Sequence, residues 1–462
     1  MTATHDLAEA ALAVAYERVP AEAIERAKRV ILDTFACLIG GYRSKTGQIC
    51  REVARELGGP KQATIIGEGR RTSLRGAILA NEAMIRYLDY NDDMSIALGP
   101  GDLAAAHPSG ALPVAFAVGE WKGLSGRQVI EAVVAGYEVI GRMLSSYSVS
   151  LEVRGFHHGS TLVYAGAAMA GKLLGLSADE IAHAMGIAGS LTVGLDILDA
   201  DGEEYVMTKN IADGLFAERG LLGALLARRG FTGPERVIEG NKGFAHAVLG
   251  GRERFQPKPA SNRPYILATV LKGMCAEATT HGHLKATCEL VTKHRLKPDD
   301  IAEIRIRTCK RAVVHTGDPA KKYPRNKESA DHSSYFLTAM AVLDGRITPR
   351  IYDEGNFTDP RVRALIDKVV LEHGPEFDAR PPAAETIIRT RDGNQYRRRV
   401  EPEELKGDPA NPMNDADLKE KFLLCAEGVL PRRRVQRIID ACLALDRQER
   451  FADVLPLLKV RG

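Results

Sequence analysis

The stretch Ile301–Thr308, "IAEIRIRT", separates two kinds of sequence in this chain. Apolar and polar residues alternate along it, which predicts a β-strand with one buried and one solvated face. The later stretch Ala384–Val400, "AETIIRTRDGNQYRRRV", predicts two more strands, because Asp392-Gly393 near its centre favours a β-hairpin with a type I′ turn. Helical patterns surround these strands at residues 281–296, 332–345 and 362–373. A mixed α+β segment is therefore expected here.

Helical periodicity dominates the sequence on both sides of this segment. Residues 21–41 repeat apolar side chains at helical spacing, and Ser177 with Glu180 forms a capping-box pattern before another helix. No strong β-alternation occurs before about Arg263, and helical patterns return from about Ala416 to the end. We therefore expect a mostly α protein with one large all-helical domain, an inserted or appended α+β domain, and a C-terminal helical return.

Bulk composition excludes several classes of protein. At 462 residues the chain is too long for one ordinary core, and 45% hydrophobic with 27% charged residues is typical of a globular protein. The formal net charge of +3 is too small to favour nucleic acid or a membrane surface as a partner. No apolar run reaches the roughly 20 residues that span a bilayer, and the first residues are acidic where a secretory signal is basic. We expect a cytoplasmic protein whose seven scattered cysteines are reduced.

Five polar islands interrupt the apolar helices and supply the candidate functional residues. They are residues 87–110 with "LDYND" and "HPSG", 154–161 with "RGFHHGST", 205–210 with "YVMTKN", 272–283 with "KGMCAEATTHGH", and 317–333 with "GDPAKKYPRNKESADHS". In the second island, His157-His158 lies between glycines that permit close backbone approach, before a helix start that attracts anions. Lys209 in the third has apolar neighbours, so we expect it to be partly buried and to need a partner such as a substrate carboxylate.

The spacing of these residues does not support a metal site or a nucleotide site. His107, His157 and Asp89 are chemically suitable ligands, but no ligand spacing accompanies them, and the pair in His281-Gly282-His283 lacks adjacent acids. The sequence has no G-x-x-x-x-G-K-[ST] phosphate loop, no G-x-G-x-x-G after a strand, and no G-x-S-x-G nucleophile elbow. The remaining option for an enzyme is acid–base chemistry without a cofactor, which needs a base, an acid and cations for an anionic substrate.

Taken together and in order, the islands resemble those of the MmgE/PrpD family, the 2-methylcitrate dehydratase and cis-aconitate decarboxylase family. The similarity runs from about Asp33 to Gly345, and "ARRGFTGPERVIEG" and "ESADHS" are its most specific parts. It implies an all-helical main domain formed by both chain ends, 1–262 and 404–462, with an α+β lid domain inserted at 263–403. It also implies an active site in the cleft between them, a homodimer, and no metal or organic cofactor.

The resemblance carries site residues over to this chain. It implies a catalytic set of Asp89, His107, His157 and Lys209, with Asp93, His158, Lys272, His281, Tyr323 and Arg325 as candidate substrate contacts. Two departures argue against a decarboxylase. Asp93 stands where decarboxylating relatives often carry a threonine or a similar hydroxyl, and the loop at 317–326, which contains Tyr323, resembles the dehydratase-like branch.

The hypothesis that follows is a cofactor-independent hydro-lyase, a dehydratase of a small 2-hydroxy di- or tricarboxylate such as 2-methylcitrate or citrate. His107 and His157 serve as its base and acid in an order that the sequence does not decide, and Asp89 orients an imidazole. Lys209 and Lys272 stabilise the negative charge that develops on the substrate. The alternatives are an epimerase or isomerase of a small dicarboxylate such as iminodisuccinate, a cis-aconitate decarboxylase, and an inactive relative that binds an organic acid.

Overall fold

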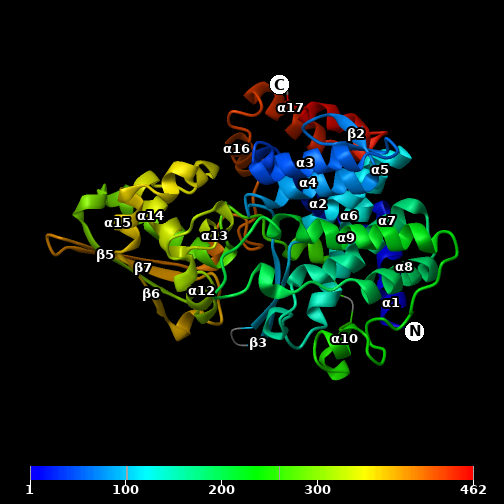
Figure 1. The fold of residues 1–462 in the computed structure, drawn as a ribbon, viewed down its shortest axis with the longest axis horizontal. Coiled ribbons are helices and arrows are strands. Elements are labelled where there is room, and N and C mark those ends of the chain that lie inside the picture. The colour runs from blue at the N-terminus through cyan, green and yellow to red at the C-terminus, as the bar shows by residue number, and fades with distance from the viewer. Residues whose placement is uncertain (1, 100–101, 260, 461–462) are drawn as a thin grey trace.

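The computed structural model describes residues 2–99, 102–259 and 261–460. The chain forms two lobes, one made mainly of helices and one that contains the largest sheet (Figure 1). Most of the regular structure is helical, so the prediction of a mostly α protein is confirmed. No helix in the described part of the chain is long and apolar enough to cross a membrane.

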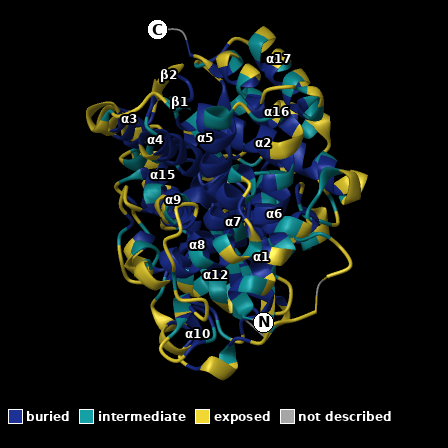
Figure 2. Cartoon of the chain, turned by 90° about the vertical axis from the view of Figure 1, so that its right-hand side faces the viewer, coloured by how far each residue is buried: buried dark blue, intermediate teal, exposed yellow. Residues whose placement is uncertain are grey.

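The helical lobe contains the helices of the first half of the chain. They are α1 (Ala3–Ala13), α2 (Ala21–Gly41), α3 (Lys45–Leu57), α4 (Leu74–Arg86), α5 (Leu112–Lys122), α6 (Gly126–Ser145), α7 (Leu162–Leu174), α8 (Ala178–Leu191), α9 (Lys209–Ala227) and α10 (Phe244–Ala247). Helix α7 is apolar on almost every side and packs against α6, α8 and α9 in the buried interior (Figure 2). At Gly166 a Cβ atom would collide with the backbone of Ala217, so this glycine lets α7 and α9 approach closely.

The end of the chain returns to this lobe. Helices α16 (Asp415–Cys425) and α17 (Arg432–Leu443) pack against α2, so both chain ends build the helical lobe (Figure 1). The buried Lys421 fixes α16, because its Nζ lies 2.6 Å from Asp33 Oδ1 and donates to the carbonyl oxygens of Tyr90 and Lys272. This lysine therefore joins α16 to the segments that carry two of the predicted site residues.

The second lobe is built on a four-stranded sheet with the order β6-β5-β7-β8. Its strands are β5 (Ile301–Thr308), β6 (Val369–His373), β7 (Ala384–Thr390) and β8 (Gln395–Val400), and only the β5–β6 pair is parallel. Its helices are α11 (His281–His294), α12 (Lys310–His315), α13 (Lys327–Ala330), α14 (Ser334–Asp344) and α15 (Pro360–Ile366). Helix α11 packs on β7 and β8, and the alternating Ile304 and Ile306 of β5 are buried as their pattern predicts.

Two predictions about this lobe are wrong in detail. The hairpin between β7 and β8 is present, but Thr390 and Asn394 close a three-residue loop in which only Gly393 has a positive φ, so the turn is not type I′. The segment 362–373 was expected to be one helix, whereas α15 ends at Ile366 and the residues after it form β6. The residues of β6 form a strand because they pair with β5. A short apolar run does not by itself distinguish a strand from a buried helix.

The first half of the chain also contains strands that were not predicted from the sequence. Two hairpins are present, β1 (Ala63–Ile65) with β2 (Arg70–Thr72) and β3 (Met94–Gly99) with β4 (Asp102–Ala106). The second hairpin is rich in Ala and Gly and shows no clear alternation of polarity, which explains why the expectation of an all-helical domain missed it. Its side chains reach the cavity described next.

The boundaries predicted for the domains, at 262/263 and 403/404, stay predictions. The turn Tyr265–Ala268 follows the first of them and still packs against α2 and α6 of the helical lobe, where Tyr265 Oη lies 3.0 Å from Ser145 Oγ. The chain thus crosses between the lobes after this turn, along the segment that holds Lys272.

Candidate active site

A cavity of about 460 Å³ lies where residues of the two lobes meet. Six of the ten predicted site residues line it: Asp89, Asp93, His107, His158, Lys272 and His281. Two more, His157 and Lys209, lie directly behind residues of this lining, and the last two lie elsewhere. The volume is that of a small-molecule site, and the lining combines apolar side chains such as Leu103 and Val270 with many ionisable groups.

Asp89 follows the end of α4 and is held in a left-handed backbone conformation, with a φ of 47°. Its buried carboxylate forms an ion pair with Arg86 and accepts a hydrogen bond from Lys272 Nζ at 3.0 Å. Burial alone would raise the pKa of the Asp89 carboxyl, but Lys272 and Arg86 outweigh burial and hold that pKa well below its usual range. Asp89 therefore balances two cations and is bonded to them, in place of the imidazole that the sequence hypothesis gave it.

His107 lies at the end of β4, immediately before the short 3-10 helix Pro108–Ala111. Its Nδ1 is 2.6 Å from the carbonyl oxygen of Asp92, and a carbonyl only accepts, so Nδ1 carries the proton and Nε2 has a free lone pair. Burial lowers the pKa of His107 well below its usual value, and Arg86 and Lys272 lower it further. At neutral pH this imidazole is neutral and can accept a proton at Nε2.

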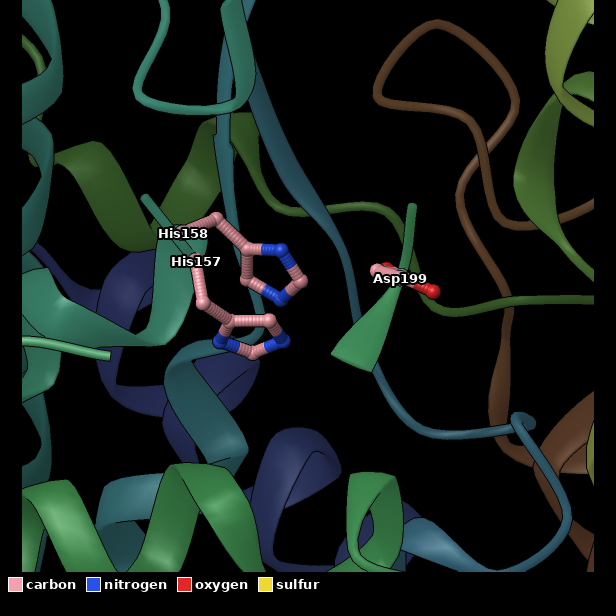
Figure 3. Close-up of side chains that lie close together, drawn as sticks. All are labelled: His157, His158 and Asp199. Carbon is pink, nitrogen blue, oxygen red and sulfur yellow. The ribbon is translucent and has the colours of Figure 1, made fainter. Parts of the chain in front are cut away.

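His157 and His158 stack at the start of the turn that leads into α7, with ring centroids 4.1 Å apart (Figure 3). The backbone N–H of Gly159 donates to His157 Nδ1 at 3.1 Å, so the neutral His157 carries its proton on Nε2. Burial lowers the pKa of His157 to about 4 and that of His158 well below its usual value. His158 also lies edge-on to His107, with ring centroids 5.2 Å apart, so the three imidazoles form one cluster.

A second network links Lys209, the first residue of α9, to residues that the sequence hypothesis did not select. Lys209 Nζ forms an ion pair with Asp199 and donates to His332 Nε2 at 3.2 Å. His332 Nδ1 lies 2.5 Å from Asp331 Oδ1, which orients the ring as a carboxylate–imidazole pair does. His332 could have been selected from the sequence, because it lies inside the quoted motif "ESADHS". Asp199 could not, because no recognisable motif surrounds it.

The structure does not bring Tyr323 and Arg325 to the cavity. The Tyr323 hydroxyl donates to Asp367 on the surface of the sheet lobe, and Arg325 forms a bidentate ion pair with the surface residue Glu204. Arg311 of α12, which the sequence hypothesis did not name, lines the cavity instead. Its Nη1 lies 3.5 Å from Glu152, and burial, which would lower the pKa of Arg311, is outweighed by Glu152 and Glu277.

Three groups of side chains in the described residues have a spacing that could hold a metal ion. They are His157–His158–Asp199 (Figure 3), Asp199–His315–His332 and Asp89–Asp331–His332. Each contains a carboxylate that already neutralises a cationic side chain, since Asp199 is bonded to Lys209 and Asp89 to Lys272. A carboxylate that is already bonded to an ammonium group has less charge to offer a metal, so these groups fit an acid–base site better than a metal site.

Comparison with known proteins covers nearly the whole chain. The family model for the MmgE/PrpD N-terminal domain matches residues 5–256, and that for the MmgE/PrpD C-terminal domain matches residues 274–445. The chain is 28% identical to a cis-aconitate decarboxylase of Aspergillus terreus, over 97% of this chain and 93% of that protein. It is 28% identical to the human cis-aconitate decarboxylase, over 94% and 90% of the two chains. It is 25% identical to the 2-methylcitrate dehydratase of Salmonella typhimurium, over 94% and 92% of the two chains.

Proposed function

The chain belongs to the MmgE/PrpD family, and we propose that it is a cofactor-independent lyase that dehydrates a small 2-hydroxy di- or tricarboxylate such as 2-methylcitrate or citrate. The observation that carries the proposal is the neutral His107 with a free Nε2, placed in one cavity with Lys272 and Asp93. These three side chains supply a base, a cation for a carboxylate, and a group that can assist a leaving hydroxyl.

Cationic side chains hold the carboxylates of the substrate in this proposal. Lys272 and Arg86 contact Asp89 on one side of the cavity, and Arg311 lies on the sheet lobe side. A guanidinium binds a carboxylate through two parallel hydrogen bonds, which fixes the orientation of the substrate as well as its charge. Several buried cations that face one small cavity favour a substrate with more than one carboxylate.

The first chemical step is removal of a proton from the carbon beside a substrate carboxylate. His107 Nε2 takes this proton, and Lys272 stabilises the charge that develops on the neighbouring carboxylate. The anionic substrate itself raises the affinity of His107 for a proton, because it adds negative charge to a site where burial and cations keep the ring neutral.

The second step breaks the bond between carbon and the hydroxyl oxygen. Burial raises the pKa of Asp93, although Lys272 opposes this, so Asp93 can hold a proton that it gives to the leaving hydroxyl. An alkene and water are released, while His107 keeps the proton from carbon and Asp93 becomes a carboxylate. Exchange of protons with solvent then restores both groups.

Decarboxylation of an unsaturated tricarboxylate is the second candidate, because the chain is about as similar to cis-aconitate decarboxylases, at 27–28% identity, as to 2-methylcitrate dehydratases, at 25–27%. The carboxyl group of Asp93, which lies beside His107, favours dehydration instead, since a protonated carboxyl there can supply the proton that a leaving hydroxyl needs. An epimerase of a small dicarboxylate would use the same base and the same cations.

One experiment separates these activities. The protein is incubated in heavy water with citrate, 2-methylcitrate, cis-aconitate, malate or an aspartate-derived imine, and the products are followed by NMR. An alkene formed from a hydroxy acid supports the dehydratase. Carbon dioxide lost from cis-aconitate assigns a decarboxylase, deuterium incorporated without an alkene assigns an epimerase, and no change in any sample supports an inactive binding protein.

We also propose that the sheet lobe acts as a lid and that the protein is a cytoplasmic homodimer. The lid is supported by the position of the cavity, whose walls come from both lobes. The homodimer is supported by exposed apolar side chains concentrated on and beside α8 and α9, here called the apolar face: Leu191, Val193, Leu195, Ile197, Val206, Met207, Leu215 and Leu222. A concentration of exposed apolar side chains is typical of a surface that another protein covers.

A further inference from the structure

Two carboxyl groups that take no part in the proposed reaction lie deep in the helical lobe, behind the histidine cluster. Glu82 of α4 and Asp213 of α9 are 1% and 0% exposed. None of the four carboxyl oxygens makes a hydrogen bond of good geometry with a described residue. The backbone N–H of Gly214 acts weakly on Glu82, and Arg86 Nε lies 3.3 Å from Asp213 Oδ2. Burying two carboxyl groups with so few hydrogen bonds and only one nearby cation costs folding free energy. A pair that persists at this cost is a candidate for a functional role.

Three glycines make the space for this pair. At Gly110, just after His107, a Cβ atom would lie 2.5 Å from Asp213 Cβ and 3.3 Å from Glu82 Oε1. At Gly159, just after His158, a Cβ would collide with Asp213 Oδ1, and at Gly214 it would collide with the side chain of Glu82. The turns that carry the two cavity histidines are therefore packed directly on the carboxyl pair.

His158 lies between the pair and the cavity. Its Nε2 is 4.0 Å from Asp213 Oδ1, and its Nδ1 is 3.9 Å from Glu152 Oε1 on the cavity wall. The same ring contacts His157 and is edge-on to His107. A charge on Asp213 therefore acts on the ring that packs against the proposed base.

We propose that Glu82 and Asp213 share a single proton and act through His158 as positioning residues for the proposed reaction. The inference rests on the proposed function for its effect on turnover, but not for the existence of the shared proton. A negative charge on Asp213 favours the His158 tautomer with its proton on Nε2 and holds the ring against His107.

Electrostatics support a shared proton, because two buried carboxyls that both border the position of a Gly110 Cβ atom cannot readily both be ionised. Burial, and then the charge of Asp213, raises the pKa of Glu82 well above its usual value. Burial raises the pKa of Asp213 to about 6, although Arg86 opposes this. At neutral pH Glu82 therefore keeps its proton and Asp213 carries the charge.

Other charged groups face these residues from each neighbouring element. Arg86 of α4, Asp92 after α4, Lys209 of α9 and Asp199 act on the carboxyl pair, and Glu152, His157, His107, Arg86 and Asp199 act on His158. Among them, Asp92 has a pKa that burial raises to about 6, so the pH dependence of turnover alone does not identify Asp213. The test therefore needs a signal from His158 and a signal from the carboxyl pair.

The experiment uses the full-length protein and the variants Asp213→Asn, Glu82→Gln and Glu218→Gln. Glu218 is the matched control, because it is a buried acid on the same helix α9 whose ion pairs are with Arg75 and Arg219 and not with a histidine. With histidine labelled by 13C at Cε1, we expect the His158 signal of the unaltered protein and of Glu218→Gln to shift with a midpoint near pH 6. In Asp213→Asn this shift is absent.

Infrared difference spectra detect the proton directly. Asp196, whose pKa burial raises to about 8, and Asp93 contribute carbonyl bands of their own at pH 7. The Glu82 band is the component that is present in the unaltered protein and in Glu218→Gln and is lost in Glu82→Gln. These two measurements need no substrate. In turnover, Asp213→Asn lowers kcat by about 10- to 100-fold with a smaller change in KM, because a positioning residue acts on the chemical step.

The proposal is overturned if the infrared band is absent or unaffected by Glu82→Gln, or if the His158 shift persists in Asp213→Asn. If Asp213→Asn does not fold, the infrared spectra of the unaltered protein and of Glu82→Gln are enough to decide whether Glu82 holds the proton. If the protein turns over none of the substrates, the proposed function fails, and the two substrate-free measurements still decide whether the pair shares a proton.

Discussion

At the scale of single residues, His107 is the side chain whose removal tests the chemistry most directly. We expect His107→Gln to lower kcat by about 10²- to 10⁴-fold, because a positioned base contributes that much, while the thermal unfolding midpoint changes little. His183→Gln is the control, since His183 Nδ1 also bonds a backbone carbonyl, that of Gly233, at 3.2 Å but lies outside the cavity lining. Equal turnover by the two variants would remove His107 from the mechanism.

The ion pair between Lys272 and Asp89 makes a different prediction, about stability. Lys272→Met leaves the buried Asp89 with Arg86 as its remaining cation, and breaking a buried pair in this way costs about 3–5 kcal/mol of unfolding free energy. The double variant Lys272→Met with Asp89→Asn removes both charges and is expected to recover part of that loss without recovering activity. Urea unfolding of the unaltered protein, Lys272→Met, Asp89→Asn and the double variant measures the coupling, and strictly additive losses would contradict it.

Residue types and their order along the chain were enough to find His107, Lys272 and the histidine pair, because each lies in a short motif of unusual composition. Asp199 and Arg311 could not be found this way. Arg311 pairs with Glu152 of a distant segment, and Asp199 pairs with Lys209 across a loop whose conformation no local pattern predicts. Asp89 was found, but its role changed, since only the fold shows that its oxygens reach two cations.

At the scale of elements, the sequence predicted long periodic segments well and short apolar ones poorly. Helices α9, α11 and α14 and strand β5 have patterns that extend over many residues, so local propensity and tertiary packing agree. Strand β6 and the hairpin β3–β4 are short, and their pairing partners decide their conformation. The hairpin matters for function, because one of its faces forms a wall of the cavity.

That wall gives a prediction about substrate size. Ala105 of β4 lines the cavity with a single methyl group, so Ala105→Leu fills part of the space that a large substrate needs. We expect the variant to raise KM for a tricarboxylate more than for malate by about 10-fold or more, since one methylene in a pocket is worth about 1–3 kcal/mol. Ala105→Ser, which nearly conserves the volume, is the control. A KM that rises equally for both substrates would show that the hairpin does not select for size.

At the scale of the whole molecule, the proposed homodimer rests on the apolar face beside α8 and α9. Leu195 and Leu191 are 66% and 80% exposed there, and Asp199 and Lys209 of the site lie on the same stretch of chain. In a two-fold interface the substitution Leu195→Asp occurs in both copies, so we expect the dissociation constant to rise by at least about 10²-fold, a cost of about 3 kcal/mol. Leu57→Asp, at the exposed end of α3, is the matched control.

Sedimentation velocity across a range of concentrations measures the effect. The unaltered protein and Leu57→Asp should sediment as dimers where Leu195→Asp is a monomer. The monomer should also lose turnover, because the segment between α8 and α9 that positions Asp199 against Lys209 would lose the surface that covers it. An unaltered protein that sediments as a monomer at every concentration would contradict the dimer. A monomeric Leu195→Asp with full activity would show instead that each subunit completes its site alone.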